Sequence, residues 1–220
     1  MNLLRNEAEG FVLAGGRSSR MGQNKALIEI AGRRLIQHAV DILREAGLKT
    51  RIAGGASELS QLAPMVSDMP EESGLGPLAG ISAALSACSC RFAVFLPVDM
   101  PLIPASLIEY LVRHAVMTQK AVTVVSVAGF TQTFPAIIDC AAIESLRESL
   151  HSDDRNCLKA FRAVGEALPG GFEALSLEVL LQPGQVRHPL ALFPNQWFLS
   201  GNTPDDLRVL DEAIAGRGRR

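Results

Sequence analysis

Short apolar runs alternate along the chain with longer stretches in which apolar residues recur every third or fourth position. The apolar runs, which predict buried strands, are 10–14, 49–53, 64–68, 91–97 and 121–127. The periodic stretches, which predict helices, are 34–48, 76–88 and 104–116, with a short polar helix over 57–62. Because strands and helices alternate, the pattern favours βαβ units and a mostly parallel sheet.

Two parts of the chain depart from this alternation. The segments 121–127 and 132–138 are joined by a short turn, so an antiparallel excursion is an alternative to another βαβ unit. In that arrangement Pro135 favours an edge position, because proline has no backbone N–H to give to a neighbouring strand. From about Gly165 to Gln196 the periodicity gives way to loops rich in glycine and proline, and we assign this segment no role.

Length and composition indicate one domain rather than two. The chain has 220 residues, of which 48% are hydrophobic, enough for one sizeable α/β core. We expect a single domain over residues 1–216 and a disordered basic tail over 217–220. Its four cysteines are more typical of small buried hydrophobes than of a metal site, and its four histidines show no ligand spacing.

Charge and hydropathy exclude several classes of partner. A net charge of −2 and an isoelectric point near 6.1 give no electrostatic footprint for nucleic acid. The first ten residues lack the apolar core of a signal peptide, and no run approaches the roughly 18 apolar residues of a membrane span. We therefore expect a cytoplasmic protein that binds neither nucleic acid nor membrane.

The stretch "FVLAGGRSSRMGQNKAL", from Phe11 to Leu27, links the first predicted strand to the first long helix. Its two adjacent glycines let backbone N–H groups approach an anion, and its basic side chains can offset the charge of a triphosphate. The spacing matches neither a P-loop nor the dinucleotide fingerprint. A nucleotide triphosphate site is the sharper interpretation, and a flexible solvated connection is the alternative.

A single carboxylate, Asp99, follows the buried strand 91–97 and is bracketed by Pro97 and Pro101. The two prolines restrict the backbone on either side of the carboxylate. Mg²⁺ in phosphoryl chemistry is usually held by one or two carboxylates together with substrate phosphates, so Asp99 is a candidate metal ligand. The alternative is that Asp99 only bonds amides of the turn.

Three ordered motifs, "LAGGRSSRMGQNKA", "SGLGPLAGI" and "LPVDMPLI", together resemble the molybdenum cofactor guanylyltransferases of the MobA type. The resemblance covers about Phe11 to Pro104 and resumes at "LSGNTPDDL" near the C-terminus. It implies a doubly wound, twisted sheet with helices on both faces, a nucleotide half over 9–104 and an acceptor side over 105–216. It also implies transfer of GMP from Mg-GTP to the terminal phosphate of molybdopterin, with release of pyrophosphate.

The resemblance assigns roles residue by residue. It places the catalytic groups on Arg20, Lys25 and Asp99, with Asp99 also holding Mg²⁺. The nucleotide-binding residues that it implies are Leu13, Ala14, Gly15, Gly16, Lys25, Asp68 and Asp99.

Contacts to the acceptor rest on weaker matches. They fall on Asn202 and on Arg155, which could equally be a solvated charge at a helix start. Two departures from the family pattern are 53–55, which read Ala-Gly-Gly where the family has an asparagine, and Ser200, where the C-terminal pattern has its first asparagine.

The reaction that follows is direct in-line attack by the acceptor phosphate on the α-phosphorus of GTP, without a protein nucleophile. GTP and molybdopterin are then the substrates, and proteins that supply or receive the cofactor are expected as transient partners. Three alternatives stay open: a related transferase that uses CTP, one that acts on a sugar or polyol phosphate, and a nucleotide-binding adaptor that catalyses nothing. Retention of both Lys25 and Asp99 speaks against the adaptor.

Overall fold

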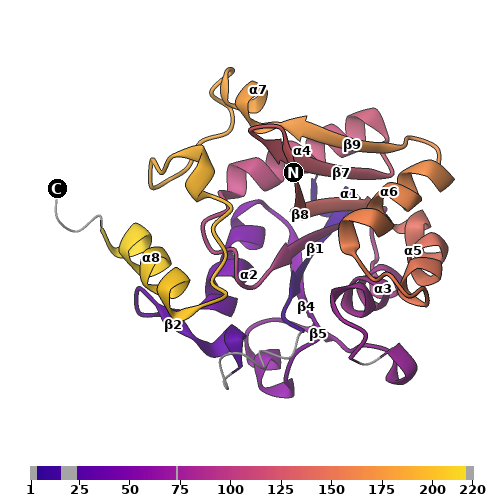
Figure 1. The fold of residues 1–220 in the computed structure, drawn as a ribbon, viewed down its shortest axis with the longest axis horizontal. Helices are drawn as coiled ribbons and strands as arrows, with labels where there is room; N and C mark the ends of the chain where they lie inside the picture. The colour runs from indigo at the N-terminus through magenta and orange to yellow at the C-terminus, as the bar shows by residue number, and fades with distance from the viewer. Residues whose placement is uncertain (1–3, 16–23, 73, 217–220) are drawn as a thin grey trace.

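A seven-stranded sheet forms the centre of the molecule (Figure 1), in a computed structural model that describes residues 4–15, 24–72 and 74–216. The strand order is β5-β4-β1-β6-β8-β7-β9. Its strands are β1 (Ala8–Leu13), β4 (Lys49–Ala53), β5 (Met65–Val66), β6 (Phe92–Pro97), β7 (Val122–Val127), β8 (Phe130–Asp139) and β9 (Phe172–Ser176). A separate two-stranded sheet pairs β2 (Glu29–Ile30) with β3 (Arg33–Arg34).

Helices cover both faces of the large sheet. They are α1 (Leu4–Glu7), α2 (Leu35–Glu45), α3 (Pro77–Ala87), α4 (Ala105–Thr118), α5 (Ile143–Leu150), α6 (Cys157–Ala167), α7 (Leu177–Leu181) and α8 (Pro204–Ala215). Buried apolar residues form two clusters, one drawn from α2, α4, α7 and α8 and the other from α3, α5 and α6. This two-sided core confirms the predicted α/β fold with helices on both faces of a mostly parallel sheet.

Single-turn 3₁₀ helices connect several of these elements. They are η1 (Lys25–Leu27), η2 (Ser57–Gln61), η3 (Pro70–Glu72), η4 (Cys140–Ala142) and η5 (Pro194–Gln196). The short polar helix that we expected over 57–62 is η2. The four cysteines are half-buried rather than buried, contrary to the expectation. No helix in the described parts of the chain is long and apolar enough to cross a membrane.

The antiparallel alternative is the one that the structure adopts, but the expected edge position of Pro135 is wrong. β8 lies between β6 and β7 and is antiparallel to both. Pro135 falls just beyond the last β6–β8 pair, Phe95 with Ala136, and opposite the point where the β7–β8 register shifts. An interior strand can hold a proline there because the missing N–H coincides with an irregularity of the ladder.

The segment 165–196 contains two elements that the sequence pattern did not predict, β9 and α7. β9 is an edge strand parallel to β7, and all five of its residues are half-buried, so its sequence "FEALS" lacks a clean alternation. α5 and α6 were also missed. Of these elements, β9 forms the edge of the sheet opposite β5, and α5 packs against α3.

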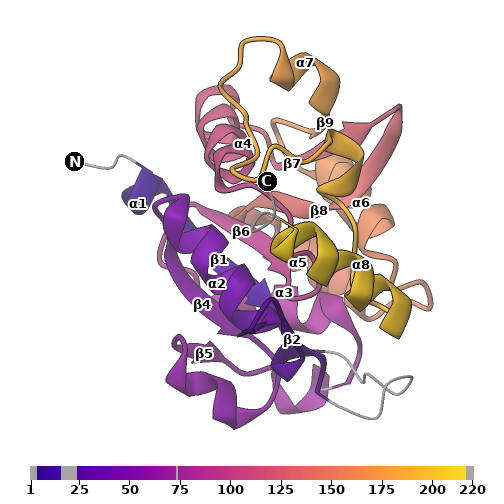
Figure 2. The same ribbon diagram turned by 90° about the vertical axis from the view of Figure 1, so that its left-hand side faces the viewer.

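The carboxyl ends of β1, β4 and β6 lie side by side, because the three strands are parallel neighbours. A backbone bond from Val98 N to Leu13 O ties the segment after β6 to the end of β1. The C-terminal helix α8 lies beside β2, as Figures 1 and 2 both show. This edge is where an open α/β sheet binds its ligands.

Candidate active site

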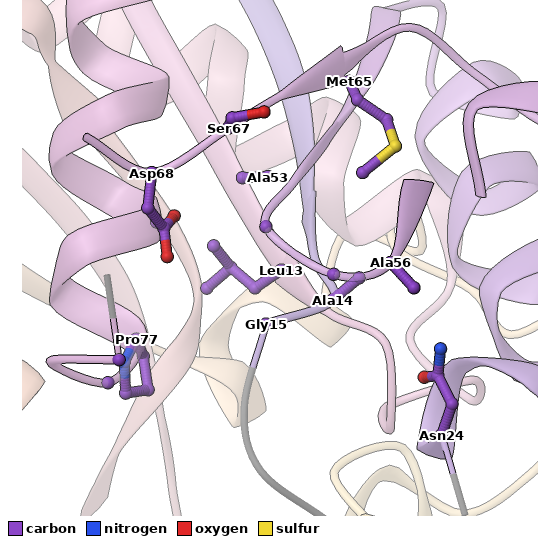
Figure 3. A pocket seen from close by; sticks show the side chains of 15 residues that line it. Leu13, Ala14, Gly15, Asn24, Ala53, Ala56, Met65, Ser67, Asp68 and Pro77 are labelled. Carbon is purple, nitrogen blue, oxygen red and sulfur yellow. The ribbon is translucent and has the colours of Figure 1, made fainter. Parts of the chain in front are cut away.

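A pocket of about 720 Å³ opens at the carboxyl edge of the sheet (Figure 3). The ends of β1, β4 and β5 form its floor, and the N-terminus of α3 forms one side. The residues that line it are Leu13, Ala14, Gly15, Asn24, Ala53, Gly54, Gly55, Ala56, Met65, Ser67, Asp68, Gly74, Gly76, Pro77 and Gly80. Most of these side chains are small, so the chain leaves room for a ligand against its backbone.

Gly54 brings two loops of the pocket into backbone contact. A Cβ added at Gly54 would lie 3.1 Å from Gly15 Cα, and its φ of +71° is one that larger residues rarely adopt. The loop after β1 and the loop after β4 therefore touch through their main chains. The glycines at 54 and 55 let the two loops approach through their backbones, and they offer no side-chain amide to a ligand.

Asp68 is the charged residue of the lining. Figure 3 shows its carboxylate directed toward the space between Leu13 and Pro77, on the opposite side of the pocket from Asn24. The Oδ1 atom of Asp68 is buried and has no hydrogen-bond partner among the described residues. Burial, and to a lesser degree the charge of Glu72, raises the pKa of the Asp68 carboxyl above its ordinary value. An acceptor with these properties suits a ligand that brings N–H or O–H donors.

A hydrogen-bonded cluster of three side chains, from distant parts of the chain, lies next to this pocket. Lys25 Nζ donates to Asp99 Oδ2 at 2.6 Å and to Asn202 Oδ1 at 2.7 Å. The side chains of Lys25 and Asp99 are 20% and 19% exposed, so the pair is reachable from solvent but largely screened from it. A charge-assisted bond in such surroundings is stronger than one on an open surface.

Backbone bonds hold the C-terminal segment against this cluster. Gly201 N donates to Asp99 O at 3.0 Å, which fixes the chain beside the end of β6. The Thr203 hydroxyl caps α8 by accepting from Asp206 N, while Asp206 Oδ2 accepts from Asn202 N and Thr203 N. The sequence "NTPDD" thus forms a rigid corner that presents the Asn202 amide to Lys25.

Asp99 and Asn202 offer the oxygen ligands that a hard divalent cation prefers. Both already hold a cation, the Lys25 ammonium, which shows that the position suits positive charge. Among residues 4–15, 24–72 and 74–216, no three His, Cys, Asp or Glu side chains converge as a metal cluster. Asp99 Oδ2 and Asn202 Oδ1 form a donor set that fits a hard divalent cation, with one carboxylate among its ligands.

The structure brings most of the predicted site residues to one edge of the sheet. Leu13, Ala14, Gly15 and Asp68 line the pocket, and Lys25, Asp99 and Asn202 are joined by hydrogen bonds. Gly16 and Arg20 lie outside the described residues.

Arg155 stands apart from this group. It is exposed, precedes α6 and donates to Leu150 O at 2.9 Å, and none of its described hydrogen bonds reaches Lys25, Asp99 or Asn202.

Sequence reasoning missed other members of the site. Asn24, Ser67 and Gly76 line the pocket without having been singled out, and Glu72 acts on Asp68. Asn24 adjoins Lys25 and Ser67 adjoins Asp68, so proximity along the chain could have suggested both. No feature of the sequence distinguishes Glu72 from its neighbour Glu71.

Comparisons with known proteins identify the family and the fold. A family model described as the MobA-like NTP transferase domain matches residues 10–168. A probable molybdenum cofactor guanylyltransferase from Opitutus terrae is 36% identical over 151 residues, covering 67% of this chain and 74% of that protein. The molybdenum cofactor guanylyltransferase of Xanthomonas euvesicatoria is 42% identical, but the chain spans only 50% of its length.

Solved structures share the fold at lower identity. Molybdopterin-guanine dinucleotide biosynthesis protein A from Archaeoglobus fulgidus aligns with a TM-score of 0.74 and 21% identity, covering 94% of this chain and 99% of that one. The protein Rv0371C from Mycobacterium tuberculosis, solved with manganese, aligns with a TM-score of 0.63 and 19% identity, covering 94% and 98%.

Proposed function

Since the chain belongs to the MobA-like NTP transferase family and is therefore a nucleotidyltransferase, we propose that it transfers GMP from GTP to the terminal phosphate of molybdopterin. The products are molybdopterin guanine dinucleotide and pyrophosphate. The names of the relatives from Opitutus and Xanthomonas support this substrate pair. Residues 9–104 then bind the nucleotide, and residues 105–216 form the acceptor side.

The observation that carries the proposal is the bond of Lys25 to both Asp99 and Asn202 beside the lined pocket. Lys25 and Asp99 belong to the half that binds the nucleotide, and Asn202 belongs to the half assigned to the acceptor. A side chain that acts on both substrates during the transfer has to lie between the two binding sites. The cluster occupies such a position, at the carboxyl edge where β1 and β6 end.

The nucleotide binds along the pocket with its base toward Asp68 and its phosphates toward Lys25. Asp68 accepts hydrogen bonds from the guanine edge or the ribose, and the backbone N–H groups near Gly15 approach the phosphates. Gly16 and Arg20 are proposed as further contacts to the phosphates. Asn24 and Gly54 shape the wall between the two ends of the ligand.

Transfer proceeds by in-line attack of an acceptor phosphate oxygen on the α-phosphorus of GTP. A bond forms between that oxygen and the α-phosphorus, and the bond to the α–β bridging oxygen breaks as pyrophosphate leaves. Lys25 neutralises charge that develops on the α-phosphate oxygens, and Asn202 orients the Lys25 ammonium and the acceptor phosphate.

Mg²⁺ held by Asp99 would supply further charge neutralisation at the phosphates. The manganese of the Mycobacterium structure supports use of a divalent ion in this fold. Arg155 is retained as a contact to the pterin side, and cofactor-supplying and cofactor-receiving proteins are proposed as transient partners.

The proposal is tested by incubating the purified protein with each of the four nucleoside triphosphates, Mg²⁺ and molybdopterin, and measuring pyrophosphate release. We expect release with GTP that depends on the acceptor. Equal release with CTP would favour a cytidylyltransferase, release only with a sugar phosphate would assign another acceptor, and tight nucleotide binding without release would favour an adaptor.

A further inference from the structure

Each of two carboxylates, those of Asp68 and Glu72, has one buried oxygen without a hydrogen-bond partner among the described residues. These oxygens are Asp68 Oδ1 and Glu72 Oε2. Glu72 is only 4% exposed, although its neighbour on the same 3₁₀ turn, Glu71, is exposed. Burying an ionised carboxylate without partners costs stability, so a chain that needed only a turn at η3 would gain by replacing Glu72.

The surroundings of the two carboxylates contain few other charges. The ideal Cβ positions of Gly54 and Gly80 lie 3.7 and 3.8 Å from Asp68 Oδ1, so the loop after β4 and helix α3 face it with uncharged glycines. At the end of α5, His151 Nε2 lies 3.9 Å from Glu72 Oε1, too far for a good hydrogen bond. Among the described residues, the charge that acts on the Asp68 carboxyl is that of Glu72. The titratable group beside Glu72 is the His151 imidazole.

We propose that Glu72 is a positioning residue for the base site, which acts through Asp68 to set how readily the pocket accepts a base that presents N–H donors. Glu72 is absent from the pocket lining, so it acts through its charge on Asp68 rather than by touching the ligand. The proposal rests on the proposed function, because it takes the ligand at Asp68 to be the guanine of GTP.

The expected behaviour follows from the charge of Asp68. Only the ionised carboxylate accepts one N–H donor on each of its two oxygens, because protonation turns one oxygen into an O–H donor. GTP affinity therefore falls as the pH drops through the pKa of Asp68. Burial and the negative charge of Glu72 both raise that pKa, which places the loss of affinity at a higher pH than an ordinary aspartate would. Removing the Glu72 charge therefore moves the midpoint of GTP binding to lower pH.

The test is calorimetric titration of the full chain with GTP and saturating Mg²⁺ at a series of pH values from 4.5 to 8. Glu72→Gln keeps the size of the side chain and removes its charge, and Glu71→Gln is the matched control on the exposed side of the same turn. Protonation of GTP itself is common to all three proteins and cancels in the comparison. We expect the Glu72→Gln midpoint to fall by about half a pH unit or more, equivalent to roughly threefold tighter GTP binding on the acid side. The Glu71→Gln midpoint should stay with that of the unmodified protein.

An unchanged midpoint for Glu72→Gln, or an equal shift for both variants, would overturn the proposal. Affinity lost equally at every pH together with a lower melting temperature would show a structural role only, and would overturn it too. Failure of the proposed function would look different. A second calorimetric titration, with CTP in place of GTP, would then show that the unmodified protein has no preference for GTP. The conservative variant Glu72→Asp keeps the charge and should retain most of the original pH profile.

Discussion

Lys25 is held between a carboxylate and an amide that lie 74 and 177 residues away along the chain. Its ammonium donates a hydrogen bond to each of these two groups. When phosphates enter, the same ammonium can turn toward them, because a lysine stem is long and freely rotating. At the scale of single residues, we therefore propose that the phosphates of the nucleotide replace these oxygens as partners of Lys25.

Replacing Lys25 by alanine should lower the turnover of GMP transfer by about 100-fold or more, since a preorganised charge at a developing phosphate charge is lost. The matched control is Lys159→Ala, which removes an exposed lysine bonded to Asp154. Steady-state kinetics separate the possibilities: near-normal kcat with a raised KM would make Lys25 a binding group only.

Asp99→Asn should lower Mg²⁺-dependent transfer by a similar factor of about 100 or more while the fold stays intact, because asparagine keeps the shape and loses the charge. The variant also weakens the bond to Lys25, so the melting temperature is measured beside a Mg²⁺ titration of activity. A destabilised protein whose folded fraction turns over normally would remove the metal role from Asp99.

Asp68→Asn should raise the melting temperature at neutral pH by a few degrees and weaken GTP binding at the same time. The folded pKa of Asp68 is raised, so its ionisation stabilises the unfolded chain more than the fold, and stability is lost as the pH climbs from the ordinary value through the raised one. Asparagine cannot ionise and escapes that loss. The difference in melting temperature should disappear below about pH 4, and a variant that is less stable at pH 7 would contradict this account.

The regular elements near the glycine-rich loop are those that the sequence predicts best. β1 and β6 are buried parallel strands, and their apolar runs predict them. α2 has its apolar residues on one face. β9 and α7 were missed because an edge strand with half-buried residues carries no clear period. The antiparallel direction of β8 was one of two alternatives that the sequence left open, and its interior place depends on a register shift beside Pro135 that no local pattern reveals.

A close contact packs α6 against β9, in the part of the fold that the sequence did not predict. A Cβ added at Gly165, in α6, would lie 2.4 Å from Phe172 Cβ, at the start of β9. Gly165→Ala should therefore destabilise the fold by about 1–3 kcal/mol, although alanine normally favours a helix. Glu166→Ala, at the exposed neighbouring position, is the control for helix propensity. Chemical denaturation compares the two, and a stabilised Gly165→Ala protein would show that α6 and β9 are not so closely packed.

At the scale of the whole molecule, the site depends on the C-terminal segment around Asn202 packing against the N-terminal segment around Lys25. The fold places Asn202 beside Lys25, and the "NTPDD" corner with α8 keeps it there. The resemblance of the motifs to one family made Lys25, Asp68 and Asp99 predictable. Tertiary packing produces the bond between Lys25 and Asn202 and the burial of Glu72. Neither could be predicted from the spacing of residues in the sequence.

The central claim, transfer of a guanylyl group between two bound substrates, is tested most directly by following GTP labelled at its α-phosphorus. With Mg²⁺ and molybdopterin present, we expect the label in a pterin dinucleotide, in an amount equal to the pyrophosphate released, and none attached to the protein. Label bound covalently to the protein would contradict direct attack by the acceptor. Pyrophosphate formed without molybdopterin, or label left entirely in GTP, would contradict the assigned reaction itself.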